Sequence, residues 1–222
     1  MEKINRYIDQ TILRPETSEQ DIGAFLKEVK TYRFFAACVN PCWVRFVRTE
    51  LPRDIKVCSV VGFPLGASTT KAKAYAAADL MENGCDEIDM VMNIGKLKSK
   101  DYKYVGQEIR TIVRAISGKV LKVIIETCLL TDEEKKAAVR IIMEKGAHFV
   151  KTSTGFSKQG AVVRDVTMLR SIVGPDFGIK ASGGIRDYAS AKIFLQAGAN
   201  RIGTSAGVQI MRTPEPGHTD QK

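Results

Sequence analysis

The sequence contains few of the residues from which metal sites and disulfide frameworks are built. It has two histidines, and its five cysteines are odd in number and form no CxxC pair. A histidine-rich metal site is therefore not expected. The cysteine pattern predicts buried free thiols rather than disulfides or a zinc site.

Long hydrophobic runs are also missing. No stretch approaches the ~20 apolar residues of a membrane span. Residues 1–6 lead into no apolar segment of the kind found in signal peptides. These features predict a cytoplasmic protein without membrane contact.

Acidic residues are the minority among the charged ones. The chain has 34 Lys and Arg against 25 Asp and Glu, which gives a net charge of +9. This charge suits either a nucleic-acid-binding protein or an enzyme that attracts phosphorylated metabolites. The basic residues are scattered through predicted helices and aromatics make up only 7% of the chain. We therefore favour a phosphorylated small molecule over nucleic acid as partner.

A repeated pattern of helix, glycine, apolar strand and polar loop runs along the chain. The first helix is predicted to begin with a capping box formed by Thr17 and Gln20. Strands that are apolar on both faces indicate a parallel sheet covered by helices. We predict eight strands, at 6–11, 34–39, 56–61, 86–92, 121–126, 149–152, 178–181 and 201–203.

Eight such units predict one α/β domain over residues 1–222, folded as a closed (β/α)8 TIM barrel. Its first strand is short, and residues 213–222 are expected to form a polar, flexible tail. An open doubly wound sheet is the alternative. That fold usually carries a Gly-rich dinucleotide loop after its first strand, and the sequence has none there.

Ionisable side chains stand at the C-terminal ends of four predicted strands, where barrels build active sites. They are Asp89, Glu126, Lys151 and Lys180. Lys151 and Lys180 are one βα unit apart, which places them on neighbouring strands. Two facing ammonium groups repel, so at least one pKa should be lowered. A neutral amine can then attack a carbonyl to form a Schiff base, while Asp89 balances charge and moves protons.

Each of these residues also has a structural interpretation when taken alone. Lys151 could extend into water, since lysine is rarely buried. Asp89 could be a turn or salt-bridge residue, and Lys180 could be its counter-ion. Three such residues at matched strand ends favour a shared catalytic role.

Glycine-rich loops follow the last two predicted strands, at 182–185 and 203–207. Loops in these positions are the usual phosphate site of a TIM barrel. Glycine allows a close backbone approach to the phosphate oxygens, and Ser205 adds a hydroxyl group.

Six motifs together resemble the deoxyribose-phosphate aldolases, a family of class I aldolases, over about residues 7–208. The motifs are DQT (9–11), EIDMVMNIG (87–95), KVIIET (122–127), VKTSTGF (150–156), KASGGIR (180–186) and RIGTSAG (201–207). The resemblance implies reversible cleavage of 2-deoxy-D-ribose 5-phosphate to D-glyceraldehyde 3-phosphate and acetaldehyde, as part of deoxyribose catabolism. It implies no metal and no other cofactor, and relatives are often dimers.

The resemblance also implies roles for individual residues. Lys151 would form the Schiff base, Lys180 would tune it and relay protons, and Asp89 would donate and accept protons. Substrate contacts would come from Asp9, Thr11, Cys38, Thr154 and Gly155. Phosphate contacts would come from Gly183, Gly184, Gly203, Thr204 and Ser205.

Two positions depart from the family pattern. Gln10 stands where many relatives have histidine or leucine, and Phe156 replaces a lysine seen in some members. The alternatives to this function are a related Schiff-base aldolase for another phosphorylated sugar and a non-catalytic basic protein that binds phosphate or RNA.

Overall fold

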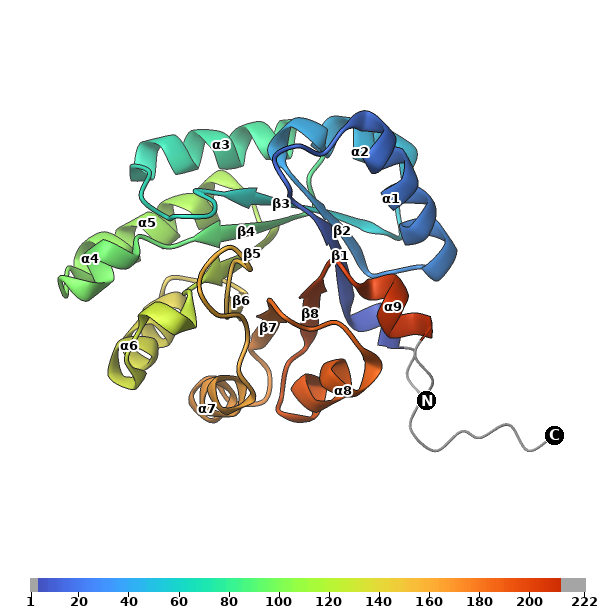
Figure 1. Cartoon of the computed structure of the whole chain (residues 1–222). Helices are drawn as coiled ribbons and strands as arrows, with labels where there is room; N and C mark the ends of the chain where they lie inside the picture. The colour runs from blue at the N-terminus through green and yellow to red at the C-terminus, as the bar shows by residue number, and fades with distance from the viewer. Residues whose placement is uncertain (1–3, 213–222) are drawn as a thin grey trace.

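Eight parallel strands close into a barrel that is surrounded by helices (Figure 1). The structure is a computed structural model and describes residues 4–212. Each strand pairs with its neighbours in chain order, and β1 pairs with β8 to close the barrel. The predicted TIM barrel is therefore confirmed. The strands are β1 (Ile8–Ile12), β2 (Ala36–Val39), β3 (Lys56–Val61), β4 (Glu87–Val91), β5 (Val120–Ile124), β6 (Phe149–Lys151), β7 (Gly178–Ser182) and β8 (Arg201–Thr204).

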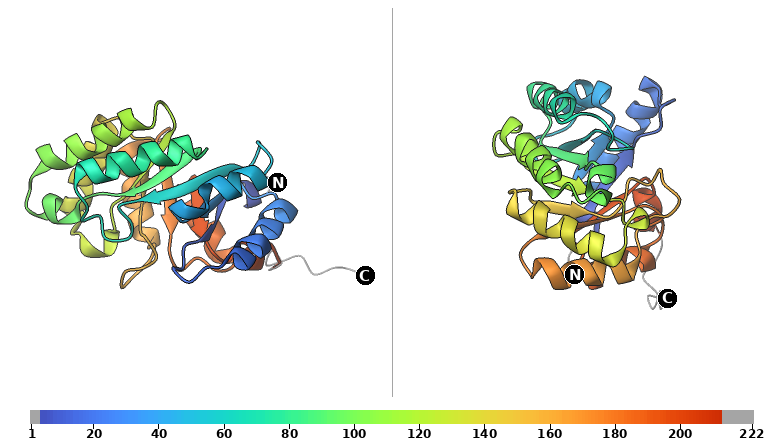
Figure 2. Two further views of the ribbon diagram at one scale, coloured as in Figure 1. Left: turned by 90° about the horizontal axis from the view of Figure 1, so that it is seen from above. Right: turned by 90° about the vertical axis from the view of Figure 1, so that its left-hand side faces the viewer.

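The helices form the outer layer on all sides of the strands, as the two further views show (Figure 2). Three short 3-10 segments accompany them, at Ile4–Tyr7, Pro41–Trp43 and Thr127–Leu129. The α-helices are α1 (Glu19–Tyr32), α2 (Val44–Glu50), α3 (Thr70–Glu82), α4 (Ile94–Lys98), α5 (Tyr102–Ala115), α6 (Asp132–Glu144), α7 (Val163–Val173), α8 (Tyr188–Gln196) and α9 (Gly207–Arg212).

The apolar core lies between the barrel and the helices. On α1, the residues Ile22, Phe25, Leu26 and Val29 are all buried, as their helical spacing predicts. Strands β2, β4 and β7 are buried along their whole length. Burial of both strand faces is typical of a parallel sheet that is covered on both sides. The face that does not pack against the helices lines the barrel interior, where polar side chains lie.

The predicted first helix cap is wrong by one residue. Ser18, not Thr17, is the N-cap of α1, and Asp21 completes the capping box. Thr17 instead donates a hydrogen bond from its hydroxyl to the carbonyl of Arg14. Two adjacent hydroxyl residues offer the same cap chemistry, and the backbone turn decides between them.

Short elements were missed and some strand ends shift. The first strand begins at Ile8 rather than 6 because a 3-10 turn precedes it. Helices α2, α4 and α9, of seven, five and six residues, have no counterpart among the predicted elements. Such segments are too short for a helical period to stand out in the sequence.

The cysteines are all free, but not all are buried. Cys38, Cys58 and Cys85 are buried, Cys128 is half-buried, and Cys42 is exposed. The prediction of buried thiols is therefore wrong for Cys42, which lies in the 3-10 turn after β2.

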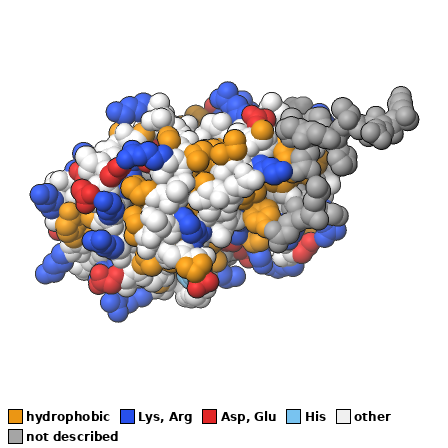
Figure 3. Space-filling view, turned by 90° about the horizontal axis from the view of Figure 1, so that it is seen from below, with side chains coloured by type: hydrophobic (Ala, Val, Ile, Leu, Met, Phe, Trp, Pro, Cys, Tyr) orange, Lys and Arg blue, Asp and Glu red, His pale blue; other side chains and the backbone are white. Residues whose placement is uncertain are grey.

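Basic side chains are dispersed rather than gathered on one face of the molecule (Figure 3). On the face shown in Figure 3, Lys and Arg lie among hydrophobic and neutral groups. Among residues 4–212, no helix has the length and apolar character needed to span a bilayer. The expected polar tail at 213–222 lies outside the described residues.

Candidate active site

Charged side chains are buried inside the barrel, where apolar residues usually form the packed layers. Within residues 4–212 this interior group comprises three carboxylates and four cations. Each is at most 7% exposed. The group consists of Asp9, Glu87, Asp89, Lys122, Lys151, Lys180 and Arg201.

Asp89 brings the three predicted catalytic residues together. Its Oδ2 accepts hydrogen bonds from the ammonium groups of Lys151, at 2.8 Å, and Lys180, at 2.7 Å. Lys151 and Lys180 are register partners on β6 and β7, as the spacing predicted. The second oxygen, Oδ1, pairs with Lys122 at 3.0 Å. One carboxylate thus holds three ammonium groups.

The expected effect of repulsion on the pKa values does not hold for Lys180. Burial favours its neutral form, but the carboxylates of Asp89 and Asp9 outweigh burial and raise its pKa above the usual value. Asp89 shows the converse: burial would raise its pKa, but Lys122, Lys151 and Lys180 hold the pKa well below its usual range. Lys180 and Asp89 therefore both favour their charged forms in the free protein.

Three members of the interior group were missed by the sequence reasoning. Lys122 lies within β5, Arg201 begins β8, and Glu87 lies two residues before Asp89 on β4. Side chains two apart on a strand share a face, so Glu87 could have been found from Asp89. A lysine inside an apolar strand is a similar signal for Lys122.

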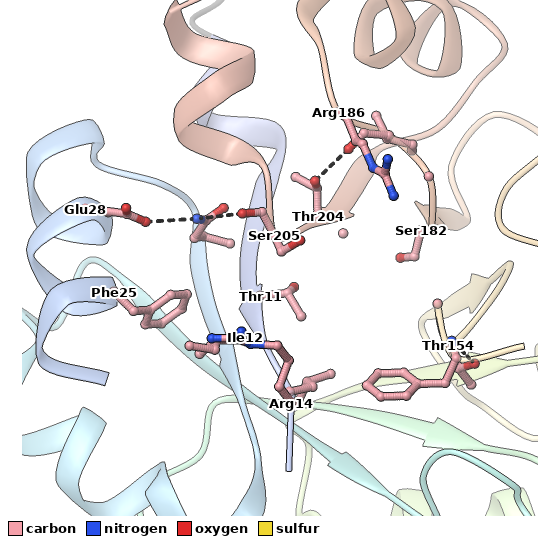
Figure 4. A pocket seen from close by; sticks show the side chains of 18 of the residues that line it. Thr11, Ile12, Arg14, Phe25, Glu28, Thr154, Ser182, Arg186, Thr204 and Ser205 are labelled. Atoms are coloured by element: carbon pink, nitrogen blue, oxygen red, sulfur yellow. Dashed lines mark hydrogen bonds between the residues drawn. The ribbon is translucent and has the colours of Figure 1, made fainter. Parts of the chain in front are cut away.

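A cavity of about 610 Å³ opens above this group, and Lys151 lies in its wall. The other walls are formed by loops after β1, β6, β7 and β8 and by α1. Figure 4 shows Thr11, Thr154, Ser182 and Ser205 around the space. The cavity thus gives an outside molecule access to the Lys151 amine, whereas Asp89 and Lys180 are fully buried.

All five predicted phosphate residues line this cavity. Gly183 and Gly184 have φ angles of 91° and 81°, which side chains rarely adopt. At Gly203, an added Cβ would lie 2.3 Å from the Ser182 Oγ. Thr204 does not present its hydroxyl freely, since Oγ1 donates to the carbonyl of Ile185 at 2.6 Å.

Two arginines missed by the sequence reasoning also border the cavity. Arg186 ends the KASGGIR motif, and Arg14 follows β1. Figure 4 shows them on different sides of the space. Both carry positive charge to a cavity whose glycine loops already suit an anion. Arg186 could have been identified from its place two residues after the glycine pair.

The other predicted substrate residues are divided between the cavity and the interior. Thr11, Thr154 and Gly155 line the cavity. Asp9 and Cys38 are instead fully buried inside the barrel. Both carboxylate oxygens of Asp9 have partners: Oδ2 pairs with Lys180 at 2.5 Å and Oδ1 with Arg201 at 2.8 Å.

Glu126 does not join the interior group, although it follows β5. Its Oε2 accepts hydrogen bonds from the backbone N–H of Thr154 and from its hydroxyl, at 3.2 and 2.5 Å. Glu126 adopts a left-handed backbone with φ 51°, which is uncommon outside glycine. It therefore anchors the loop that follows Lys151.

The two residues that depart from the family pattern, Gln10 and Phe156, both make specific contacts. Gln10 is buried; its amide donates to Glu28 and to the carbonyl of Ser205, and its Oε1 accepts from the N–H of Gly207. Phe156 packs edge-on against Phe63, with ring centroids 5.2 Å apart. An apolar pair thus stands at the rim of the cavity.

Among residues 4–212, two sets of side chains have ligand atoms close enough to share a metal ion. They are Cys38, Cys58 and Asp89, and Asp9, Cys58 and Glu87. Every carboxylate in these sets already pairs with a lysine or arginine. Ammonium groups beside the ligands repel a cation, so the donors fit proton transfer better than metal binding.

Comparison with known proteins agrees with this arrangement. The model of the DeoC/LacD family aldolases matches residues 4–213. Among curated relatives, the deoxyribose-phosphate aldolase of Streptococcus sanguinis is 53% identical over 96% of this chain and 97% of its own length. That of Enterococcus faecalis is 54% identical over 94% of this chain and 96% of its own.

Solved structures give the same result. The aldolase QR15 superposes with a TM-score of 0.91 and 40% identity, covering 95% of both chains. The deoxyribose phosphate aldolase of Aeropyrum pernix, described as tetrameric, has a TM-score of 0.85 and 34% identity over 94% of this chain and 89% of its own. The chain therefore belongs to the DeoC/LacD family of aldolases.

Proposed function

We propose that this protein is a deoxyribose-phosphate aldolase. It cleaves 2-deoxy-D-ribose 5-phosphate reversibly to D-glyceraldehyde 3-phosphate and acetaldehyde, with Lys151 as the Schiff-base residue. The observation that carries the proposal is one amine in the wall of a cavity, bonded to Asp89 at 2.8 Å and backed by Lys180. The names of relatives more than half identical support the choice of substrate.

The first half of the reaction forms an imine. The neutral Lys151 amine attacks C1 of the open-chain sugar, and the resulting carbinolamine loses water to give a protonated imine. Asp89 and Lys180, which share a hydrogen bond at 2.7 Å, supply and receive the protons. The imine then withdraws electrons from the neighbouring carbon.

The second half breaks the carbon–carbon bond. A proton leaves the C3 hydroxyl, the C2–C3 bond electrons move into the enamine, and glyceraldehyde 3-phosphate departs. The enamine is protonated at C2, and one water hydrolyses the imine to release acetaldehyde and free Lys151. One water is released and one consumed, so the reaction balances without an added reagent.

The substrate phosphate would bind at the glycine wall of the cavity. Gly183, Gly184 and Gly203 bring backbone groups to the surface, Ser205 adds a hydroxyl, and Arg186 adds positive charge. Thr11, Thr154 and Gly155 would contact the sugar. We assign Asp9 and Cys38 a supporting place beneath it, because both are buried.

Borohydride trapping tests the role of Lys151. Reduction in the presence of substrate should fix a mass adduct on a peptide containing Lys151. Lys151→Ala should lose the adduct and release no detectable glyceraldehyde 3-phosphate in a coupled assay. Lys158→Ala, an exposed lysine on the same loop, serves as the control and should retain both. Adduct formation by Lys151→Ala would contradict the assignment.

The substrate has its own test. A panel of phosphorylated sugars should give the highest kcat/KM with 2-deoxy-D-ribose 5-phosphate. Faster cleavage of another sugar phosphate would indicate a related Schiff-base aldolase instead. Salt-sensitive RNA binding without lyase activity would indicate a non-catalytic protein.

We further propose one cytoplasmic domain over residues 1–222 that assembles as a homo-oligomer. The tetrameric structure of the Aeropyrum pernix relative supports the assembly. Light scattering coupled to gel filtration should give a mass at least twice the 24.5 kDa of one chain. A mass of one chain would contradict it.

A further inference from the structure

Six of the seven interior charges form a closed circuit in which acids and bases alternate. Starting at Asp89, the ion pairs run to Lys122 at 3.0 Å, from Lys122 to Glu87 at 2.5 Å, and from Glu87 to Arg201 at 3.3 Å. They continue from Arg201 to Asp9 at 2.8 Å, from Asp9 to Lys180 at 2.5 Å, and back to Asp89 at 2.7 Å. We refer to these six residues as the charge ring.

The charge ring is electrically neutral, because it holds three carboxylates and three cations. Lys151 is the seventh interior charge among residues 4–212 and bonds to the ring only at Asp89. When Lys151 is protonated, the interior carries one uncompensated positive charge. When Lys151 is neutral, the interior balances. Among the four interior cations, Lys151 pairs with one carboxylate, whereas Lys122, Lys180 and Arg201 each pair with two. The charge of Lys151 is therefore the least compensated of the four.

We propose that Glu87 and Arg201 are positioning residues that set the protonation of Lys151 without touching it. Neither pairs with Asp89: Glu87 reaches it through Lys122 in two ion pairs, and Arg201 lies three ion pairs from it in both directions. Arg201 is also stacked on Phe35, with its guanidinium carbon 3.5 Å from the ring centroid. The inference rests on the proposed role of Lys151 and adds the groups that govern it.

The ionisable groups that share the barrel interior with Lys151 come from the other seven strands. Asp89 and Glu87 come from β4, and Lys122 and Lys180 come from β5 and β7. Asp9 and Arg201 close the circuit from β1 and β8. Two thiols complete the set: Cys38 on β2 and Cys58 on β3, whose Sγ lies 3.3 Å from Asp89 Oδ1. Burial raises the pKa of the Cys58 thiol well above its usual value, whereas the hydrogen bond with Cys58 lowers the pKa of the Cys38 thiol. The charge count takes both thiols as neutral.

The proposal predicts opposite shifts for two neutral substitutions. Glu87→Gln removes a negative charge, so the proton leaves Lys151 more easily and the midpoint of its titration moves down by about one pH unit. Arg201→Met removes a positive charge and keeps an apolar side chain against Phe35. The interior then retains the Lys151 proton, and the midpoint moves up by about one pH unit.

The midpoint is measured directly by competitive labelling of Lys151 with acetic anhydride across a pH series, read by mass spectrometry. This readout needs no lyase activity, so it stands even if the proposed substrate is wrong. The acid limb of kcat/KM, which reports groups in the free enzyme, should shift in the same directions. A labelling result that holds while the sugar cleavage fails would reject only the proposed function.

Charge-preserving variants separate charge from geometry. Glu87→Asp and Arg201→Lys should keep the wild-type midpoint even where they lower kcat, and they serve if a neutral variant does not fold. Glu108→Gln is the matched control, since it neutralises a buried carboxylate outside the charge ring and should leave the midpoint unchanged. Shifts in the same direction for Glu87→Gln and Arg201→Met, no shift in either, or equal shifts in the charge-preserving variants would overturn the proposal.

Discussion

Two buried ionic clusters in this molecule respond to burial in opposite ways. The first is the charge ring inside the barrel. The second is the pair Lys73–Glu108, which joins α3 to α5 outside the barrel at 2.8 Å, with both side chains fully buried. In the pair, burial lowers the pKa of Lys73 and raises the pKa of Glu108, despite their mutual attraction. In the charge ring, the pKa of Asp89 is lowered and that of Lys180 is raised.

The number of partners explains the difference. Burial removes each charged group from water, which costs free energy once. Every opposite charge nearby then adds a separate attraction. Glu108 has one cation, whereas Asp89 has three. A buried pair therefore tends toward its neutral form, and a buried ring holds its charges. The charge ring can therefore exert a constant electric field on Lys151. The Lys73–Glu108 pair can only hold α3 against α5.

The largest expected effect comes from neutralising the shared member of the ring. Asp89→Asn leaves Lys122, Lys151 and Lys180 without their common carboxylate and removes the group proposed to move protons. We expect kcat/KM to fall by about 10³-fold, within the range known for general acid–base groups. The coupled assay for glyceraldehyde 3-phosphate measures it.

A matched control for that change lies on α7. Asp165 is also a buried aspartate, paired with Lys135 at 2.7 Å outside the barrel. Asp165→Asn should lower stability but leave kcat within about twofold of wild type, because a pair between α6 and α7 takes no part in the reaction. An equal loss of kcat in both variants would mean that the barrel interior has no special role.

Substitutions in the Lys73–Glu108 pair should change the stability of the protein rather than its activity. Lys73→Met leaves Glu108 buried without its cation, and breaking such a pair costs about 3–5 kcal/mol of unfolding free energy. The double variant Lys73→Met/Glu108→Leu removes both charges and should recover most of that loss. Chemical denaturation of the two variants tests this. A double variant that is less stable than the single one would show that the pair is worth more than an apolar contact.

The sequence was sufficient to predict the barrel and the meeting of Lys151, Lys180 and Asp89 inside it. The apolar strands, the glycines after helices and the βα spacing each follow from local chemistry. Lys151, Lys180 and Asp89 could be found because they stand at predicted strand ends, where this fold places its active site.

The charge ring could not be predicted as a whole from the sequence, for a physical reason. Both faces of a parallel barrel strand are buried, so the sequence does not show which face points inward. Lys122 stood out within an apolar strand, but the sequence did not show that it points toward Asp89. Arg201 began a predicted strand, but the sequence did not show that it pairs with Asp9 and Glu87. The predicted repulsion between Lys151 and Lys180 failed for Lys180 because Asp9, which supplies its second carboxylate, lies 171 positions away in the chain.

A methyl group placed against the charge ring should have a smaller effect. At Gly203, a Cβ would lie 2.3 Å from Ser182 Oγ and 2.9 Å from Lys180 Cε. Gly203→Ala should therefore displace the end of Lys180 and part of the glycine wall. We expect kcat/KM to fall about 10-fold, in line with ~1–3 kcal/mol for overpacking. Gly95→Ala, where the nearest atom is 3.6 Å away, is the control and should keep full activity.

The smallest expected effect is on the pH dependence of stability, and here the two clusters should differ in sign. The pKa of Asp89 is depressed by folding, so its contribution is present above the unfolded value near 4 and is lost as the pH falls. The pKa of Glu108 is raised, so its contribution is present below the unfolded value and is lost as the pH rises through the folded one.

Urea unfolding between pH 3 and 7 should separate these contributions. Asp89→Asn should lose less stability on acidification than wild type, by about 1 kcal/mol for each pH unit below the unfolded pKa of the aspartate. Glu108→Gln should lose more, because it lacks the carboxyl that binds a proton more tightly when folded. Comparing the change with pH, rather than the stability itself, cancels the constant cost of each substitution. If the unfolding free energy of the two variants changed with pH in the same way, the number of ion-pair partners would not decide how a buried charge responds to its surroundings.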